Sequence, residues 1–360
     1  MQLGVNLGYW GAGNDADNVA VARAADELGY SVCWAAEAYG SDAPTVLAWV
    51  GAQTKNIDLG AAVMQIPARS PAMTAMTAAT LDTLSGGRFR LGLGVSGPQV
   101  SEGWHGVRFD RPLARTREYV DVVRMALARE TVQYEGEHIR LPLPDGPGKA
   151  LRLTVHPVRP SVPIYLAAVG PKNLELTGEI ADGWLAIFFS PEHSELSLSS
   201  LRAGRRKALQ AQSGTSETQD DGLAGFDVVP TVPVVIDDDL ERAAMPLRAY
   251  SALYVGGMGS REKNFYNKLA CRMGFEAEAK KVQDLYLDRR HREAAMAVPF
   301  EFIDATSLIG PPERIRERLH AFAEAGVTTL SVATYAKDLE SRARTLRVVA
   351  EQLDAAGLAS

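Results

Sequence analysis

Short hydrophobic runs alternate with longer amphipathic segments along most of the chain. Each run is rich in Val, Leu, Ile or aromatic residues, which is typical of parallel strands that are buried on both faces. The pattern predicts eight strands, at residues 2–7, 31–37, 58–64, 88–96, 163–169, 183–189, 227–236 and 328–334.

The segments between these strands carry the start and stop signals of helices. Gly29 follows the amphipathic segment 19–28, and Pro71 opens a segment that ends at Gly86. Proline is favoured in the first turn of a helix, and glycine just beyond its last turn. Eight alternating strand and helix units predict an α/β fold of the (β/α)₈ TIM-barrel class, built as a single domain over residues 1–360.

Two stretches interrupt the alternation, at residues 97–162 and 237–310. The first contains one amphipathic helix, at 113–129, and then a segment rich in proline and glycine with hairpin-like apolar pieces. The second is mostly helical in its pattern. Insertions of this length hang from the loops of a barrel, so we expect both to shape the mouth at the C-terminal ends of the strands.

Composition narrows the range of partners. The 38 basic and 44 acidic residues give a formal net charge of -6, so we expect no broad basic surface for nucleic acid. No hydrophobic run approaches the ~20 residues that span a bilayer, and the first residues lack the pattern of a secretory signal. These features predict a cytoplasmic protein with no nucleic-acid or membrane partner.

Metal chemistry is also disfavoured. Cys33, Cys271 and the six histidines have none of the spacings of common metal sites. The sequence contains no nucleophile-elbow or Walker motif either. These absences predict that an organic cofactor carries the chemistry, acting on a small-molecule substrate.

Three glycines at the end of the fourth predicted strand, Gly92, Gly94 and Gly97, match the GxGxxG pattern of dinucleotide-binding sites. Pro98 and further glycines follow, so we expect no helix where a pyrophosphate would need one, and a Rossmann-type nicotinamide dehydrogenase is disfavoured. At the rim of a barrel, glycine would instead let the backbone approach a flat ligand.

A second candidate motif, Gly170–Pro171–Lys172, joins the fifth predicted strand to a helix over residues 173–180. Free N–H groups and the dipole at a helix start suit an anion, and Lys172 adds a formal charge. An ordinary strand-to-helix turn also places proline at this position, so the motif alone leaves both interpretations open.

Candidate catalytic and substrate residues also lie at strand ends and loops. Glu37 ends the second predicted strand, where an acid in a barrel is often functional, although a capping or ion-paired carboxylate is the alternative. His105 is a candidate for proton transfer at neutral pH. Tyr9, Trp10 and Trp104 are the aromatic residues that we expect in a substrate pocket.

Several phrases together resemble the bacterial-luciferase-like superfamily. The most specific is the segment 81–94, in which Ser85–Gly86–Gly87–Arg88 precedes Gly92–Leu93–Gly94. The segments 60–71, 180–183 and 325–327 fit as well. Within the superfamily, the segment 95–106 is most similar to coenzyme F420-dependent oxidoreductases, such as methylenetetrahydromethanopterin reductase and F420-dependent glucose-6-phosphate dehydrogenase.

The resemblance implies an enzyme that transfers a hydride between carbon C5 of the deazaflavin F420 and an unidentified small organic substrate. It also implies a homodimer, a non-proline cis peptide at Ala62–Val63, and Glu37 near the deazaflavin ring. The cofactor-binding residues that it implies are Ala62, Val63, Met64, Val95, Ser96, Gly97, Val169, Gly170, Pro171 and Lys172.

Two alternatives share the same fold. One is an FMN-dependent luciferase-like monooxygenase that uses oxygen, and the other is a non-catalytic flavin-binding protein. Sugar-phosphate oxidation is disfavoured, because Ala38 and Pro98–Gln99 stand where the glucose-6-phosphate enzyme has a histidine and an acidic proton donor.

Overall fold

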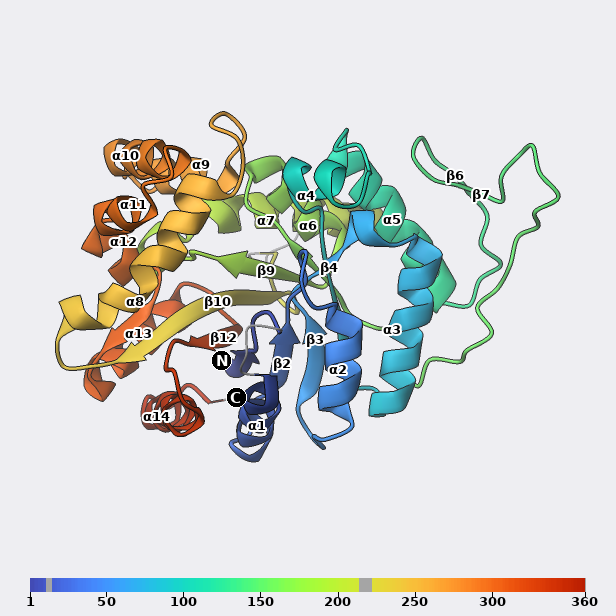
Figure 1. The fold of residues 1–360 in the computed structure, drawn as a ribbon. Coiled ribbons are helices and arrows are strands. Elements are labelled where there is room, and N and C mark those ends of the chain that lie inside the picture. Colours follow the sequence, from blue (N-terminus) through green and yellow to red (C-terminus); the bar gives the residue numbers. More distant parts are fainter. Residues whose placement is uncertain (11–14, 214–221, 360) are drawn as a thin grey trace.

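The computed structural model describes residues 1–10, 15–213 and 222–359. Within these residues, eight parallel strands close into a barrel (Figure 1): β1 (Gln2–Asn6), β2 (Val32–Ala35), β3 (Asp58–Ala61), β5 (Phe89–Gly94), β8 (Ile164–Ala167), β9 (Gly183–Ile187), β10 (Asp227–Ile236) and β12 (Thr329–Thr334). Neighbours pair in this order, and β12 pairs with β1, for example Leu330 with Leu3. The predicted TIM barrel and all of its strands are therefore confirmed.

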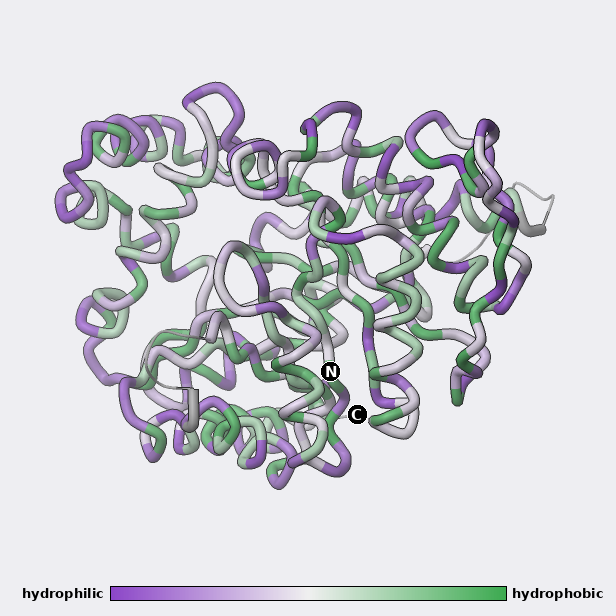
Figure 2. The backbone as a smooth tube through the Cα atoms, turned by 45° about the vertical axis from the view of Figure 1, so that its right-hand side comes forward, coloured by the Kyte–Doolittle hydropathy of each residue, from purple (hydrophilic) through white to green (hydrophobic). Residues whose placement is uncertain are grey.

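Helices surround the barrel on its outside (Figure 1). Those that follow barrel strands are α1 (Asp15–Glu27), α2 (Ala43–Gly51), α3 (Pro71–Ser85), α5 (Pro112–Leu127), α6 (Pro171–Ile180), α7 (Glu195–Ser213, after the 3₁₀ turn η2, Pro191–His193), α13 (Pro312–Glu324) and α14 (Leu339–Ala355). In α3 the Ser70 side chain accepts a hydrogen bond from Met73 N–H, and Gly86 ends the helix at φ 70°. Figure 2 shows that hydrophilic and hydrophobic residues alternate along the surrounding helices. Helices with one face on a core have this pattern, because each turn carries residues of both kinds.

The N-terminal end of the barrel is closed by charged and aromatic side chains. Arg90 on β5 forms ion pairs with Asp58 at the start of β3 and with Asp227 at the start of β10, at 2.8 and 3.3 Å. The ring of Trp34 fills the barrel interior next to Tyr165, with ring centroids 5.4 Å apart. This end supports stability, which leaves the C-terminal end of the strands for a ligand.

The first interrupting stretch, 97–162, contains α4 (Pro98–Gly103), α5, and an arm with the short antiparallel pair β6 (Tyr134–Glu135) and β7 (Arg140–Leu141). Helix α5 packs between α3 and α6, and the arm projects away from the barrel (Figure 1). The expectation that no helix follows Gly97 was wrong, because Gly97 is the N-cap of α4 and Pro98 suits its first turn. The closed parallel barrel, rather than a missing helix, excludes a Rossmann fold.

The second stretch, 237–310, is helical as expected. It contains α8 (Leu240–Ala252), the π-helical turn η3 (Leu253–Gly257), α9 (Phe265–Arg272), α10 (Glu276–Leu287), α11 (His291–Ala297) and α12 (Phe300–Ala305). These helices share a hydrophobic core of their own around Val282 and Phe302. The strand β11 (Leu308–Gly310) pairs with the end of β10 and was not predicted, because it is only three residues long.

No helix in the described part of the chain is both long enough and apolar enough to cross a membrane.

Candidate active site

The third barrel strand is interrupted near its C-terminal end. Strand β3 stops at Ala61, the peptide bond between Ala62 and Val63 is cis, and the chain resumes as β4 (Met64–Gln65), which pairs with β5. The short 3₁₀ turn η1 (Ile66–Ala68) follows. The expected cis peptide is therefore confirmed.

The glycines of β5 make room for this bulge. A Cβ atom on Gly92 would lie 1.8 Å from the carbonyl oxygen of Ala61, and one on Gly94 would lie 2.6 Å from the Val63 side chain. Gly94 also lines the cavity described next. The GxG motif thus fits the fold of β3 against β5, and only Gly94 borders the space for a ligand.

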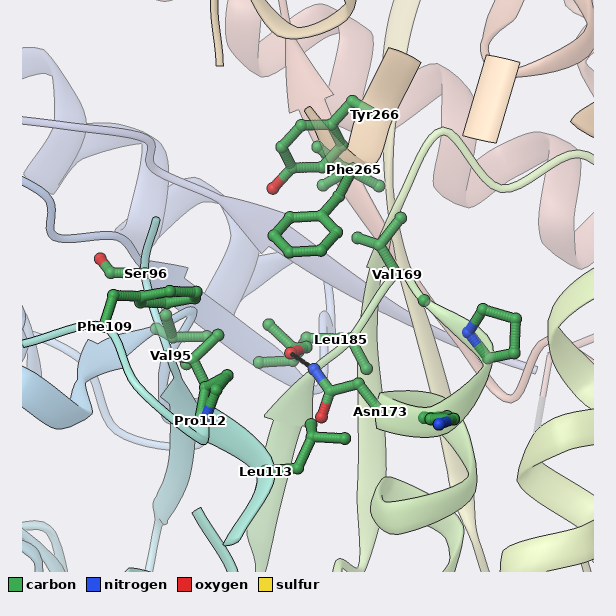
Figure 3. Close-up of a pocket in the computed structure, with 18 of the residues that line it drawn as sticks. Val95, Ser96, Phe109, Pro112, Leu113, Val169, Asn173, Leu185, Phe265 and Tyr266 are labelled. Carbon is green, nitrogen blue, oxygen red and sulfur yellow. Dashed lines mark hydrogen bonds between the residues drawn. The ribbon is translucent and has the colours of Figure 1, made fainter. Parts of the chain in front are cut away.

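A cavity of about 720 Å³ opens above the C-terminal ends of the strands. Its volume falls in the range of sites for small molecules and cofactors. Figure 3 shows apolar side chains from β5, β8, β9, α5 and α9 around it. The predicted cofactor residues that line the cavity are Val63, Val95, Ser96, Val169, Gly170, Pro171 and Lys172.

Three other predicted cofactor residues lie beside the cavity without lining it. Met64 is fully buried in the main core, and Ala62 packs against the barrel-interior cluster around Trp34. Gly97 serves as the cap of α4. The first two belong to the bulge itself, so their backbone supports the cavity from below.

The anion motif lies at one end of the cavity. Gly170 is the N-cap of α6 and has no side chain to cap it, and Pro171 has no N–H. In the described structure, no acceptor is found for the N–H groups of Gly170 and Lys172. Two free donors, the helix dipole and the exposed Lys172 ammonium therefore face the same space.

A half-buried arginine supports this motif from behind. The Arg272 guanidinium donates to the carbonyl oxygen of Val169 at 3.1 Å, and its buried Nε has no partner among the described residues. Burial lowers the pKa of Arg272. No motif in the sequence indicates this contact, because Arg272 ends α9 in the second insertion, 103 positions away from Val169.

Glu37 is buried and makes several short contacts. Its Oε1 accepts from Arg69 Nη1 at 2.6 Å and from the backbone N–H of Gln65 at 2.8 Å. Its Oε2 accepts from the backbone N–H of Ala43 at 3.0 Å. Glu37 is not among the residues that line the cavity. The carboxylate thus holds together β2, the bulge and α2.

Gln65 connects His105 to the cavity. Its Oε1 lies 2.9 Å from His105 Nε2, and its Nε2 donates to Ser96 Oγ at 2.6 Å. Because an amide oxygen can only accept, His105 Nε2 carries the proton in this pair. Ser96 is among the residues that line the cavity, and because its Oγ accepts from Gln65, its own O–H is free to donate to another group.

The three expected aromatic residues do not line the cavity. Trp104 is 67% exposed, and Trp10 lies in the loop after β1, where its backbone N–H donates to Ser41 Oγ at 3.0 Å. Tyr9 forms a side-chain hydrogen bond with Tyr254. The rings found in the cavity are those of Phe109, Phe265 and Tyr266.

Comparison with known proteins identifies the family to which this chain belongs. The family model for luciferase-like monooxygenases matches residues 6–329. The chain belongs to the luciferase-like monooxygenase family. A relative in Mycobacterium tuberculosis, named as a coenzyme F420-dependent oxidoreductase, is 44% identical over 337 residues, which cover 92% of this chain and 94% of that protein.

Two solved structures share the fold of this luciferase-like chain. The coenzyme F420-dependent tetrahydromethanopterin reductase of Methanopyrus kandleri superposes with a TM-score of 0.80 at 23% identity, over 98% of each chain. An F420-dependent secondary alcohol dehydrogenase in complex with an F420-acetone adduct superposes with a TM-score of 0.77 at 18% identity, over 99% of each chain. At these identities the likeness extends to the fold alone.

Proposed function

We propose that this protein is an oxidoreductase that binds coenzyme F420 and transfers a hydride between its deazaflavin C5 and a small organic substrate. The observation that carries the proposal is a cavity with the Ala62–Val63 bulge on one side and the α6 N-terminus at one end. The 44% identical relative named as an F420-dependent oxidoreductase supports the same conclusion. The coenzyme supplies the redox chemistry, and the protein supplies binding and orientation.

The residues present fit such a coenzyme. A flat ring requires apolar surfaces, which Val63, Val95 and Leu185 supply at the strand ends. A phosphate requires donors and positive charge, and the unpaired N–H of Lys172 and its ammonium lie in the same cavity. The apolar and the anion-binding parts of one cavity thus match the two parts of the ligand.

Ser96 is the proposed contact between the protein and the bound ring or substrate, because its free O–H borders the cavity. Glu37 and His105, the two catalytic candidates, act through Gln65 in this proposal. Glu37 fixes the backbone of Gln65, and His105 fixes its amide. Both are then positioning residues, which hold the Ser96 hydroxyl in its donor orientation.

Titration of the full chain with F420 and, separately, with FMN tests the cofactor. We expect micromolar or tighter binding of F420, followed by the change in its fluorescence polarisation, and no saturable binding of FMN. Lys172→Met is expected to weaken F420 binding about tenfold, by removing one charge-assisted contact. Binding of FMN alone would move the protein to the oxygen-using monooxygenases, and binding of neither would contradict the proposal.

A homodimer is part of the proposal. Trp49 on α2 and Met73 and Met76 on α3 are 61%, 51% and 50% exposed, and the two helices pack against each other. Exposed apolar side chains on neighbouring helices mark a surface for another protein. Light scattering is expected to give twice the mass of one chain, and Trp49→Lys is expected to give the mass of one.

A further inference from the structure

Five tyrosines gather at the mouth of the barrel, and we call them the tyrosine wall: Tyr9, Tyr250, Tyr254, Tyr266 and Tyr335. The Tyr254 ring lies 4.8 Å from the Tyr250 ring and 4.9 Å from the Tyr266 ring, centroid to centroid. Tyr335 lies 5.9 Å from Tyr250, and Tyr9 is hydrogen-bonded to Tyr254. Tyr266 lines the cavity (Figure 3), and Tyr254, Tyr250 and Tyr335 follow behind it through successive ring contacts.

The wall is electrically neutral. Burial raises the pKa of Tyr266 to about 12 and also raises the pKa of Tyr254 and Tyr335. The largest other influences on these pKa values come from neighbouring tyrosines. The hydroxyls are therefore protonated donors at neutral pH. A carboxylate or phosphate buried beside them would have no cation to offset its loss of hydration.

Positive charge lies elsewhere on the cavity. Among the residues that line it, the charged ones are Lys172 at the start of α6 and Arg111 before α5. The ring of Tyr266 instead projects from α9, in the second insertion (Figure 3). An anionic group is favoured at α6, which leaves the tyrosine wall for a part of the ligand that has no charge.

A cationic ligand is also disfavoured, because the ring faces are already in use. Tyr254 and Tyr266 meet edge to face at 82°, Tyr250 and Tyr335 at 70°, and Phe188 meets Tyr254 at 77°. Each such pair places the edge of one ring on the face of the other, where a cation would otherwise sit. No hydrogen-bond partner is found among the described residues for the hydroxyls of Tyr250, Tyr266 and Tyr335, so these hydroxyls and the ring edges stay available.

We propose that the tyrosine wall is the substrate subsite and that it selects an uncharged compound with a ring-sized apolar body and a carbonyl or hydroxyl oxygen. The apolar body packs against the tyrosine rings and Phe265, and the oxygen accepts a hydrogen bond from a wall hydroxyl. Phosphorylated and carboxylated substrates are excluded from it. This inference rests on the proposed function, since it assigns the part of the cavity that the coenzyme leaves free.

Three probes that share a benzene ring and differ in charge test whether the tyrosine wall selects uncharged compounds. Calorimetric titrations of the full chain, with and without F420, use acetophenone as the neutral probe, benzoate as the anion and phenyltrimethylammonium as the cation. We expect acetophenone to bind at least tenfold more tightly than either charged probe. Tighter binding of benzoate or of phenyltrimethylammonium would overturn the proposal, and so would saturable binding of none of the three.

Matched variants locate the probe. Tyr266→Phe and Tyr250→Phe each remove one available hydroxyl and keep the ring, and each is expected to weaken acetophenone binding about fivefold, the effect of one hydrogen bond. Tyr134→Phe, on the arm, is the control and should leave the affinity unchanged. Equal affinity in all three variants would place acetophenone elsewhere and overturn the assignment. Failure of F420 to bind would contradict the proposed function. This result can be told apart from a failure of the subsite, because the probe series is also measured without the coenzyme.

Discussion

The two sides of the cavity are built in different ways. One side, which we call the strand-end wall, consists of Val63, Val95, Ser96 and Val169. Val63 belongs to the bulge, and the other three lie one or two residues after the end of a barrel strand, so backbone pairing within the sheet fixes their places. The tyrosine wall comes from the loops after β1 and β12 and from helices of the second insertion, and side-chain packing holds it together.

This difference separates the two tasks of the proposed enzyme. A change in the strand-end wall should alter the barrel and the coenzyme site together, because both depend on the same hydrogen-bonded strands. A change in the tyrosine wall should alter substrate choice and leave the barrel folded, because the insertion has its own hydrophobic core. Barrels host many reactions in this way, through their loops rather than through their strands.

Gly92→Ala is expected to have the largest effect, and it tests how strictly the bulge depends on β5. The new Cβ would lie 1.8 Å from the carbonyl oxygen of Ala61, a backbone atom that cannot rotate away. We expect a loss of about 4 kcal/mol or more in the free energy of unfolding, measured by urea titration, and loss of F420 binding. Gly40→Ala is the control, since its Cβ would meet nothing within 4 Å. Equal stability of the two variants would show that the fold does not depend on the close contact between β5 and the bulge.

Glu37→Gln comes next and tests the support behind the strand-end wall. The substitution leaves the Arg69 guanidinium, with only 17% of its side chain exposed, without its carboxylate. Breaking a buried ion pair by removing one partner costs about 3 kcal/mol. Urea unfolding measures this loss, and Glu102→Gln, at an exposed position of α4, is the matched control. A stability loss no larger than that of the control would return Glu37 to the role of a catalytic acid.

The strand-end wall was largely predictable from the sequence, and the reason is local. Each barrel strand is a short run of buried apolar residues. The residue that follows the C-terminal end of a strand borders the mouth of the barrel, independently of the conformation of the loops. The Gly170–Pro171–Lys172 motif was identified in this way, whereas Val95, Ser96 and Val169 followed from the family resemblance. The bulge at Ala62–Val63 followed from the family resemblance.

The tyrosine wall and the Gln65 contacts were not predictable in the same way. Their members meet only in three dimensions: Gln65 is 28 positions from Glu37, 31 from Ser96 and 40 from His105. Phe265 and Tyr266 lie in an insertion helix with no motif, and tertiary packing decides which of its faces covers the mouth. Aromatic residues were expected there, but of Tyr9, Trp10 and Trp104 only Tyr9 joins the wall.

Gln65→Leu is expected to have a smaller effect, and it tests whether His105 acts on the bound ligand through Gln65. The variant keeps the size of the side chain and removes both hydrogen bonds, to Ser96 and to His105. We expect about 1–2 kcal/mol lower stability, and a pH profile of F420 binding that no longer changes when His105 is replaced by Ala. If His105→Ala still shifts the profile in the Gln65→Leu background, His105 reaches the ligand by another route.

Tyr266→Phe is expected to have the smallest effect, and it tests the neutral character of the tyrosine wall. Burial raises the pKa of Tyr266 to about 12 from an ordinary value of 10.0. Between pH 10 and pH 12 the unfolded chain therefore loses the phenolic proton while the folded chain keeps it, so the stability contributed by this group falls as pH rises. The wild-type protein should lose about 2 kcal/mol more than Tyr266→Phe over this interval, an effect confined to alkaline pH and measured by urea unfolding at each pH. Parallel curves for the two proteins would mean that the Tyr266 hydroxyl titrates as in water, and the wall would then be open to charged ligands as well.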